Sequence, residues 1–291
     1  MRERAEAFSL REYLLLTKPG IVSLVLITTL GGLYLGARGE LEPGLVFWTL
    51  LGTGLGAAGS AVLNMVLDRD IDAVMSRTAH RPLARGTAEV KKALLFGLTL
   101  QALSMAVLLY FVGVLPALLV GLASFTYTVI YSSYLKRRSW LATEIGGVSG
   151  ALPPVVGYAA ASGTLDANAL ALFLLMLVWQ PPHFWALAIK YRDDYARAGV
   201  PVLPVSKGIE ATKRRTLLYA LVTVPVSLLP YATGLVGEVY LFVALALNAL
   251  YLAVTLQFYF SDDERKAVKL FFFSVLYLAL LFGTMTFDAV R

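Results

Sequence analysis

The chain has 291 residues, of which 58% are hydrophobic, and a formal net charge of +6. Its mean hydropathy of +0.71 excludes a soluble globular domain, in which roughly 45 to 50% of residues are apolar, and indicates an integral membrane protein. The absence of cysteine excludes disulfides, thiolate metal sites and cysteine nucleophiles. In a membrane protein the placement of positive charge matters more than its size, so the net charge does not indicate nucleic-acid binding.

Nine apolar windows are long enough to cross a bilayer, which takes about 20 helical residues. Residues 1–19 precede them, carry mixed charges and show no cleavable signal pattern, so we expect an interfacial segment there. We therefore predict an all-α integral membrane protein with nine transmembrane helices in a single domain, residues 1–291. The windows are 20–37, 44–66, 93–112, 115–134, 141–161, 167–187, 216–235, 239–260 and 268–288.

Lys and Arg are distributed very unevenly between the two sides of this predicted bundle. Of 25 such residues, all except Arg38 and Arg291 fall before the first window, in alternate loops or, for Lys269, at the start of the last window on the same side. Cytoplasmic loops of membrane proteins are enriched in Lys and Arg. The N-terminus is therefore expected in the cytoplasm and the C-terminus outside.

The densest group of polar residues follows the second window, from Asn64 to Gly86. If the helix continues through it, Asn64, Asp68 and Asp72 recur at intervals of four and share one face, while Asp70 points the opposite way. Two carboxylates and an amide in a row offer oxygen ligands, and Mg²⁺ prefers one or two carboxylates together with water and phosphate oxygens. We therefore predict a metal site at Asn64, Asp68 and Asp72.

Arginines recur every four residues just beyond these acids, at Arg77, Arg81 and Arg85. Guanidinium groups match the geometry of phosphate oxygens. Carboxylates, metal and arginines together predict a diphosphate site in which Arg77 and Arg81 neutralise charge. The alternative is a solvated, charge-balanced loop between two membrane helices. The position at a membrane edge, with Asn64 on the same face as the acids, favours a functional site.

A second group of polar residues lies on the same side, after the sixth window. Pro181 and Pro182 remove backbone donors inside that window and predict a kink or break. Lys190, Asp193 and Asp194 then emerge at the membrane edge. They could be loop charges balanced by neighbouring cations, but the acids of the first group lie on the same side. We therefore expect both aspartates to contribute to metal binding and Lys190 to contact diphosphate.

His183 is one of two histidines and lies within an apolar window. An ionisable side chain inside a membrane segment indicates a functional role, so we expect substrate contact or proton handling, with helix packing as the alternative. The run from Lys136 to Arg138 is expected to anchor the orientation of the chain, with contact to diphosphate as the alternative, and Arg137 is a candidate for contacting substrate. Glu144 is expected to be an interfacial charge.

These motifs together resemble the UbiA-type intramembrane prenyltransferase superfamily. The N-x-x-x-D-x-x-x-D spacing that begins at Asn64 is typical of the whole superfamily. Three further segments are similar to its heme-farnesylating branch and extend the resemblance over nearly the whole chain. They are DRDID with RTAHRPL within 68–83, the KRR and IGG-x-x-GA-x-PP run within 136–154, and PPHFWALAIKYRDDYARAGVPVLPV at 181–205.

The resemblance implies a helical bundle around a central cavity that is open to lipid for a long isoprenoid. The implied reaction joins the farnesyl group of farnesyl diphosphate to heme B, with addition of water, to give heme O and diphosphate. Mg²⁺ is the implied cofactor, and heme B is a substrate. Membrane lipid and a heme A synthase are the other implied partners, and the site is expected to face the cytoplasm from the cell membrane.

Tyr191 and Tyr195 stand where many members of the superfamily carry aspartates four residues apart. The resemblance therefore makes them substrate contacts, together with His183 and Arg137, and leaves open whether a second metal binds. The residues implied in catalysis are Asn64, Asp68, Asp72, Arg77, Arg81, Lys190, Asp193 and Asp194.

Two other functions fit parts of this pattern. Within the same fold, the acceptor could be an aromatic quinone precursor or another tetrapyrrole, against which the PPHFW segment argues. A transporter would also have many spans with polar residues inside them. A transporter places its coupling residues near the midplane, however, whereas these acids and arginines gather at one edge.

Overall fold

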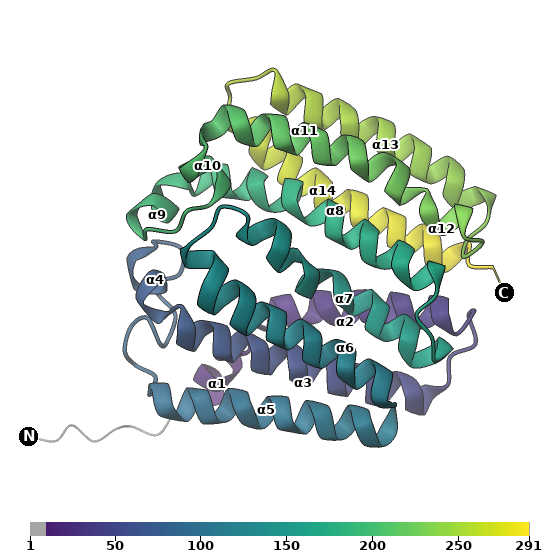
Figure 1. The fold of residues 1–291 in the computed structure, drawn as a ribbon, viewed down its shortest axis with the longest axis horizontal. Helices are drawn as coiled ribbons and strands as arrows, with labels where there is room; N and C mark the ends of the chain where they lie inside the picture. The colour runs from purple at the N-terminus through teal and green to yellow at the C-terminus, as the bar shows by residue number, and fades with distance from the viewer. Residues whose placement is uncertain (1–9, 291) are drawn as a thin grey trace, which may run out of the picture.

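The computed structural model describes residues 10–290, and the described chain is built from helices joined by short connections (Figure 1). The first nine residues of the expected interfacial segment and the terminal Arg291 lie outside the described residues. The helices are α1 Leu10–Leu16, α2 Pro19–Gly36, α3 Pro43–Leu67, α4 Arg69–Val74, α5 Val90–Phe111, α6 Val114–Phe125, η1 Thr126–Tyr134, η2 Leu135–Arg137, α7 Ala142–Ser162, α8 Ala167–Lys190, α9 Arg192–Arg197, α10 Leu203–Ser206, α11 Gly208–Ser227, α12 Leu229–Ala232, α13 Glu238–Tyr259 and α14 Arg265–Phe287.

Eight helical segments of the described chain are long and apolar enough to cross a membrane, as expected for a multi-pass membrane protein. The remaining predicted window, 141–161, falls on α7, which is not among the eight. Glycines, serines and two prolines lower its hydropathy, and most of its residues from Ala151 to Ala159 are buried. Because α2, α6 and α8 pack around α7, it needs fewer large apolar side chains than a lipid-facing helix. The count of nine spans and the orientation remain predictions.

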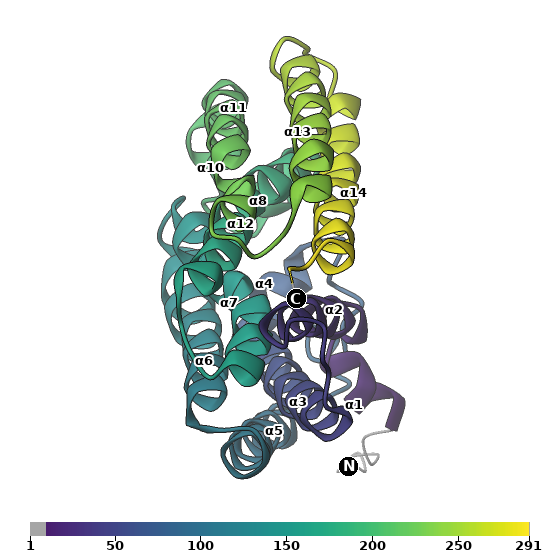
Figure 2. The ribbon, with the colours of Figure 1, turned by 90° about the vertical axis from the view of Figure 1, so that its right-hand side faces the viewer.

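The long helices run side by side in two groups, with α7 and α8 in contact at the centre (Figures 1 and 2). Helices α2, α3, α5 and α6 lie on the α7 side, and α11, α13 and α14 lie on the α8 side. The chain reverses between α5 and α6 at Gly113, whose φ of 144° is a conformation that glycine adopts readily. Pro181 and Pro182 lie inside α8, which runs without the expected break.

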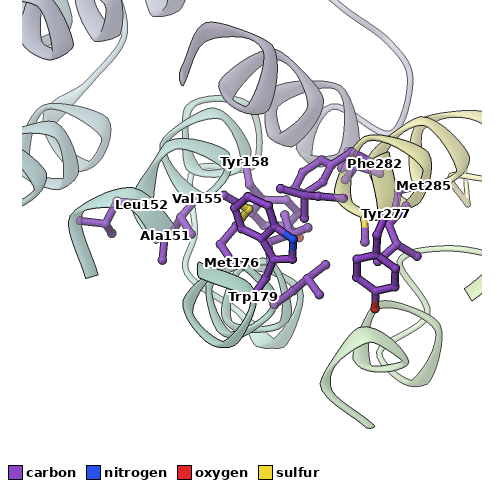
Figure 3. Close-up of a cluster of buried hydrophobic side chains, with 14 of the residues drawn as sticks. Ala151, Leu152, Val155, Tyr158, Met176, Trp179, Tyr277, Phe282 and Met285 are labelled. Carbon is purple, nitrogen blue, oxygen red and sulfur yellow. The ribbon is translucent and has the colours of Figure 1, made fainter. Parts of the chain in front are cut away.

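The main buried cluster joins the two groups of helices (Figure 3). Figure 3 shows Tyr158 of α7, Trp179 of α8 and Phe282 of α14 gathered within it. The indole N–H of Trp179 donates to the carbonyl of Ser274, at 2.8 Å, and thereby pins α8 to α14. This core keeps α8 fixed relative to the N-terminal helices.

Helices α2 and α7 approach each other closely because glycines lie at their crossing. A Cβ atom on Gly32 would meet the carbonyl oxygen of Pro154 at 1.9 Å, and one on Gly157 would meet that of Thr29 at 1.9 Å. Small residues allow membrane helices to pack backbone against backbone. This contact holds the second half of α2 against α7.

The two polar groups predicted from the sequence lie at the same end of the bundle (Figure 1). Helix α3 leads into the six-residue helix α4, and α8 leads in the same way into the six-residue helix α9. Apolar residues of both loops pack together, including Ile71 and Met75 against Tyr195 and Val200. The fold therefore brings two loops more than 100 residues apart into one edge.

Candidate functional site

The first polar group is built on a helical row that continues past the end of α3. Asp68 ends α3, its N–H donates to Asn64 O at 2.8 Å, and the N–H of Asp72 donates to Asp68 O at 2.8 Å. The three residues are no more than 3% exposed. Asp70 faces the other way, with a side chain that is 62% exposed. The predicted shared face is confirmed.

Each carboxylate of this row pairs with a cation from another segment. Lys136 of η2 lies 2.6 Å from Asp68 Oδ2, and Arg81 lies 2.7 Å from Asp72 Oδ2. Asn64 Nδ2 also donates to Asp68 Oδ2, at 2.7 Å. Buried charges are stable only when they are paired and hydrogen-bonded, and this arrangement satisfies that need with cations suited to phosphate.

Lys18 is a member of the site that sequence reasoning missed. It precedes α2, adopts a left-handed conformation with φ of 52°, and donates to Asn64 Oδ1 at 2.5 Å. Burial lowers its pKa to about 7, and the nearby positive charges of Arg81 and Lys136 act in the same direction. A left-handed residue other than glycine is uncommon and costs backbone energy. The fold therefore holds a readily neutralised amine against the amide of Asn64.

Two exposed cations of the site make cation–π contacts with the ring of Tyr191. The guanidinium of Arg77 lies 5.2 Å from the centre of this ring, and the ammonium of Lys190 lies 5.5 Å from it. Cations within about 6 Å of an aromatic face are attracted to it. Arg77 and Lys190 therefore both lie against Tyr191, whereas His80 and Arg85 are exposed farther along the loop.

The two adjacent aspartates of the second group lie in different surroundings. Asp194 is 6% exposed and accepts from Ser76 Oγ at 2.6 Å and from Arg197. Asp193 has a side chain that is 82% exposed and pairs with Arg192 at 3.5 Å. The structure thus brings Asp194, but not Asp193, against the first polar loop. Tyr195, 6% exposed, packs with Asp194 on the inner side of α9.

Arg137 is held by the outer side of the first polar loop. It makes two 2.7 Å bonds to the Asp70 carboxylate and a third to the carbonyl of Leu67. The guanidinium keeps the pKa of the Asp70 carboxyl well below its ordinary value. This geometry fits the expected anchor, and any contact of Arg137 with substrate stays a prediction.

His183 lies deeper in the bundle, between α8 and α14. Its ring is stacked between Trp179, at 4.6 Å, and Phe271, at 4.5 Å, and Nδ1 lies 2.8 Å from Ser274 Oγ. The half-buried ring is therefore packed on both faces. Contact with substrate remains a prediction for this residue.

Glu144 pairs with Arg215 of α11 at 3.0 Å and has a side chain only 11% exposed. The same guanidinium lies 4.2 Å from the centre of the Trp140 ring. Glu144 thus links α7 to α11 through an ion pair. The sequence predicted an interfacial charge at this position but not its partner.

Aromatic rings lie next to the polar row on the side of η1. Tyr127 and Tyr131 stack with ring centres 5.8 Å apart. Their segment is a π-helix of nine residues, a rare structure that often marks functional sites. Ser132 of the same segment accepts a 2.8 Å bond from Asn64 Nδ2.

The residues present fit a hard divalent cation. Asp68 Oδ1 is buried and has no hydrogen-bond partner among the described residues, although a carboxylate oxygen is a strong acceptor. The side chains of Asp68, Asp72 and Asn64 offer carboxylate and amide oxygens, which are the ligand atoms that Mg²⁺ prefers. In the described part of the chain, no group of three or more His, Asp or Glu side chains has a metal-binding arrangement. A cation here would be held by two carboxylates and the amide of Asn64.

Three partners of the site were not found from the sequence, namely Lys18, Ser132 and Ser76. One feature of the sequence could have indicated Lys18, because it is a charged residue just before the first apolar window. The two serines had no such feature, since a lone serine in a helix or loop is common.

Comparisons with known proteins identify the family of the chain. The model of the UbiA prenyltransferase family matches residues 25–277. A protoheme IX farnesyltransferase from Aquifex aeolicus is 65% identical over 293 aligned positions that cover 100% of both chains.

Among solved structures, digeranylgeranylglyceryl phosphate synthase has a TM-score of 0.82 at 18% identity, covering 97% of this chain and 98% of that one. A UbiA homolog from Archaeoglobus fulgidus bound to GPP and Mg²⁺ has a TM-score of 0.63 at 19% identity, covering 94% of this chain and 99% of that one. At these identities, the structures indicate the shared fold.

Proposed function

The chain belongs to the UbiA prenyltransferase family and, within it, to the protoheme IX farnesyltransferases, and on that premise we propose how this prenyltransferase works. It transfers the farnesyl group of farnesyl diphosphate to a vinyl group of heme B, with addition of water, and forms heme O and diphosphate. The observation that supports this most directly is the buried row from Asn64 to Asp72, faced by Lys18, Arg81 and Lys136.

The bond between C1 of the farnesyl group and the diphosphate oxygen breaks first, and both electrons leave with diphosphate. The vinyl group then supplies its π electrons to form the new carbon–carbon bond to C1. The resulting cation next to the porphyrin ring takes the oxygen of water, and one proton is released.

Asn64, Asp68 and Asp72 would hold Mg²⁺, with Asp194 or Asp193 contributing from the second loop. Bound Mg²⁺ would supply the positive charge that stabilises the departing diphosphate. Within the chain, Asp68 and Asp72 orient Lys136 and Arg81 at the same place.

Arg77 and Lys190 approach from the exposed side and complete the cationic surround of the diphosphate. Their shared contact with Tyr191 keeps both at the mouth of the site. Positively charged groups aimed at a leaving phosphate stabilise the transition state more than the ground state.

Aromatic side chains have a different role, because an allylic cation must be kept from water until the vinyl group attacks. The rings of Tyr127 and Tyr131 stack on each other in η1, beside Ser132, and the buried Tyr195 lies near Arg77, Arg81 and Lys136. Ring faces attract positive charge. We assign acceptor contact to His183, from α8, and outer diphosphate contact to Arg137.

The charged edge faces the cytoplasm in this proposal, because nearly all Lys and Arg residues lie on its side. The described chain acts as one membrane-embedded unit. Its product would pass to an enzyme that converts heme O, such as a heme A synthase.

The deciding experiment is a reaction of the purified protein in lipid or detergent with heme B, farnesyl diphosphate and Mg²⁺, followed by mass analysis of the extracted heme. We expect a mass increase equal to farnesyl plus water that disappears with the Asp68→Asn variant. If a phenolic acceptor is prenylated while heme stays unchanged, the proposed diphosphate chemistry holds but heme B is not the acceptor. A heme product formed equally well by Asp68→Asn would reject the metal site.

A further inference from the structure

Asn64 can serve as a cation ligand only if its amide presents oxygen and not nitrogen to the site. The two ends of an amide have nearly the same shape, and their hydrogen-bond partners decide which way the group points. The partners of Asn64 therefore carry information about the site.

Both N–H bonds of the amide are engaged inside the protein. Nδ2 donates to Asp68 Oδ2 at 2.7 Å and to Ser132 Oγ at 2.8 Å. Oδ1 faces the other way and accepts from Lys18 Nζ at 2.5 Å. The oxygen of Asn64 is thus the end that receives the Lys18 amine, and a divalent cation bound to it would take the place of that amine.

The hydroxyl of Ser132 is itself fixed as an acceptor toward Asn64. Its single proton is donated to the carbonyl of Tyr127, at 2.7 Å, five residues earlier in the π-helix. Ser132 is 0% exposed, so water cannot replace this partner. A flipped amide would place Oδ1 against a Ser132 oxygen without a free proton and against the carboxylate of Asp68, and both contacts are repulsive.

We propose that Ser132 is a positioning residue that locks the Asn64 amide with its oxygen toward the divalent cation. It does so from η1, because the i to i−5 spacing of a π-helix places a carbonyl within reach of its hydroxyl. Ser132 does not touch the substrate. The inference rests on the metal site of the proposed function and extends it to a residue outside the acidic row.

The test is Mn²⁺ binding, measured by electron paramagnetic resonance on the purified chain in detergent, first with the metal alone and then with inorganic diphosphate. Ser132→Ala should raise the Kd for Mn²⁺ roughly fivefold, the effect of losing one hydrogen bond to a neutral group. Ser104→Ala is the matched control, because Ser104 is equally buried and bonds the carbonyl of Gly52 on α3, away from Asn64. Its Kd should equal that of the parent protein.

A second comparison shows whether Ser132 acts through Asn64. In an Asn64→Ala background no amide remains to be oriented, so adding Ser132→Ala should not weaken Mn²⁺ binding further. In turnover assays, Ser132→Ala should raise the Mg²⁺ concentration needed for half-maximal rate and leave the rate at saturating Mg²⁺ almost unchanged. A purely structural role would also lower the rate at saturating Mg²⁺.

Equal Mn²⁺ affinities of Ser132→Ala and Ser104→Ala would overturn the proposal. So would an equal loss in both backgrounds, or the absence of Asp68-dependent Mn²⁺ binding in the parent protein. If Ser132→Ala is not recovered folded, Ser132→Cys makes the same comparison, because a thiol fills the space but accepts weakly. Failure of heme to react while Mn²⁺ binding follows this pattern would count against the acceptor alone.

Discussion

Ser76 donates a 2.6 Å hydrogen bond to the carboxylate of Asp194, which lies 118 residues away along the chain. This bond joins the loop after α4 to α9 and thereby connects the two polar groups of the site. The neighbouring residue Asp193 makes no such contact, and its side chain faces solvent. Adjacent residues on a helix point about 100° apart, so only one of the two aspartates can take part in this contact.

Substituting these two aspartates in parallel should separate their roles. Asp194→Ala removes the acceptor of Ser76 and should destabilise the protein by about 2 kcal/mol, the range for a hydrogen bond to a charged group. We expect it to lower kcat/KM for heme farnesylation roughly tenfold or more. Asp193→Ala should change stability by less than about 0.5 kcal/mol, as for other surface positions. Equal losses in the two variants would show that Asp193 also contributes to the site.

The run of three cations after η1 provides a second matched comparison. Lys136 contacts Asp68, whereas Arg138 is exposed, bonds the carbonyls of Ser133 and Tyr134, and lies over the Tyr134 ring. Lys136→Met should raise the KM for farnesyl diphosphate by about 10- to 100-fold, because a charge-assisted bond is lost. Arg138→Met removes the same charge from the same loop and should leave the KM near that of the parent protein. Steady-state kinetics at saturating Mg²⁺ measure both, and similar KM values for the two variants would rule out Lys136 as a diphosphate ligand.

Most of the fold was predictable because the signals for it are local. An apolar window of about 20 residues has few alternatives to a membrane helix, and the windows coincide with helices in the described chain. The face shared by Asn64, Asp68 and Asp72 was predictable for the same reason, since helical hydrogen bonds continue through Asp72.

The surroundings of these residues could not be predicted, because they come from segments far apart in the sequence. Lys18 and Ser132 reach Asn64 only through the packing of α2, α3 and η1. The break predicted at the prolines of α8 is absent for a related reason. A proline predicts a break from local hydrogen bonding alone, but the flanks of α8 are held by α7, α11 and α14.

The crossing of α2 and α7 should not tolerate a single added methyl group. Gly32→Ala places Cβ against the carbonyl oxygen of Pro154, a backbone atom that cannot rotate away. We expect a loss of about 3 kcal/mol or more, at the upper end for overpacking. Gly283 of α14 is the control, because a Cβ there meets nothing within 4 Å, and Gly283→Ala should be neutral or stabilise by about 0.5–1 kcal/mol. Thermal midpoints in detergent give the comparison, and equal midpoints would mean that the two helices are free to separate.

The opposite end of the bundle contains a capping carboxylate whose charge should control local stability. Asp166 begins α8, accepts from the N–H groups of Asn168 at 2.9 Å and Ala169 at 3.1 Å, and accepts from the Tyr158 hydroxyl at 2.8 Å. Partial burial pushes the pKa of Asp166 up, but the bonds from Ala169, Tyr158 and Asn168 outweigh it and leave the pKa below its ordinary value.

A carboxyl whose pKa is lowered by folding stabilises the protein above its unfolded pKa of about 3.9, and this contribution is lost as the pH falls through the folded value. Asp166→Ala should therefore cost about 1 kcal/mol at pH 7, the usual effect of losing an N-cap, and the difference from the parent protein should shrink below about pH 4. Asp166→Asn keeps a capping oxygen that does not titrate, so its stability should match that of the parent protein at pH 7 and exceed it in acid. Thermal midpoints across this pH range in one detergent distinguish these cases, and parallel curves for all three proteins would mean that the Asp166 charge does not stabilise the fold.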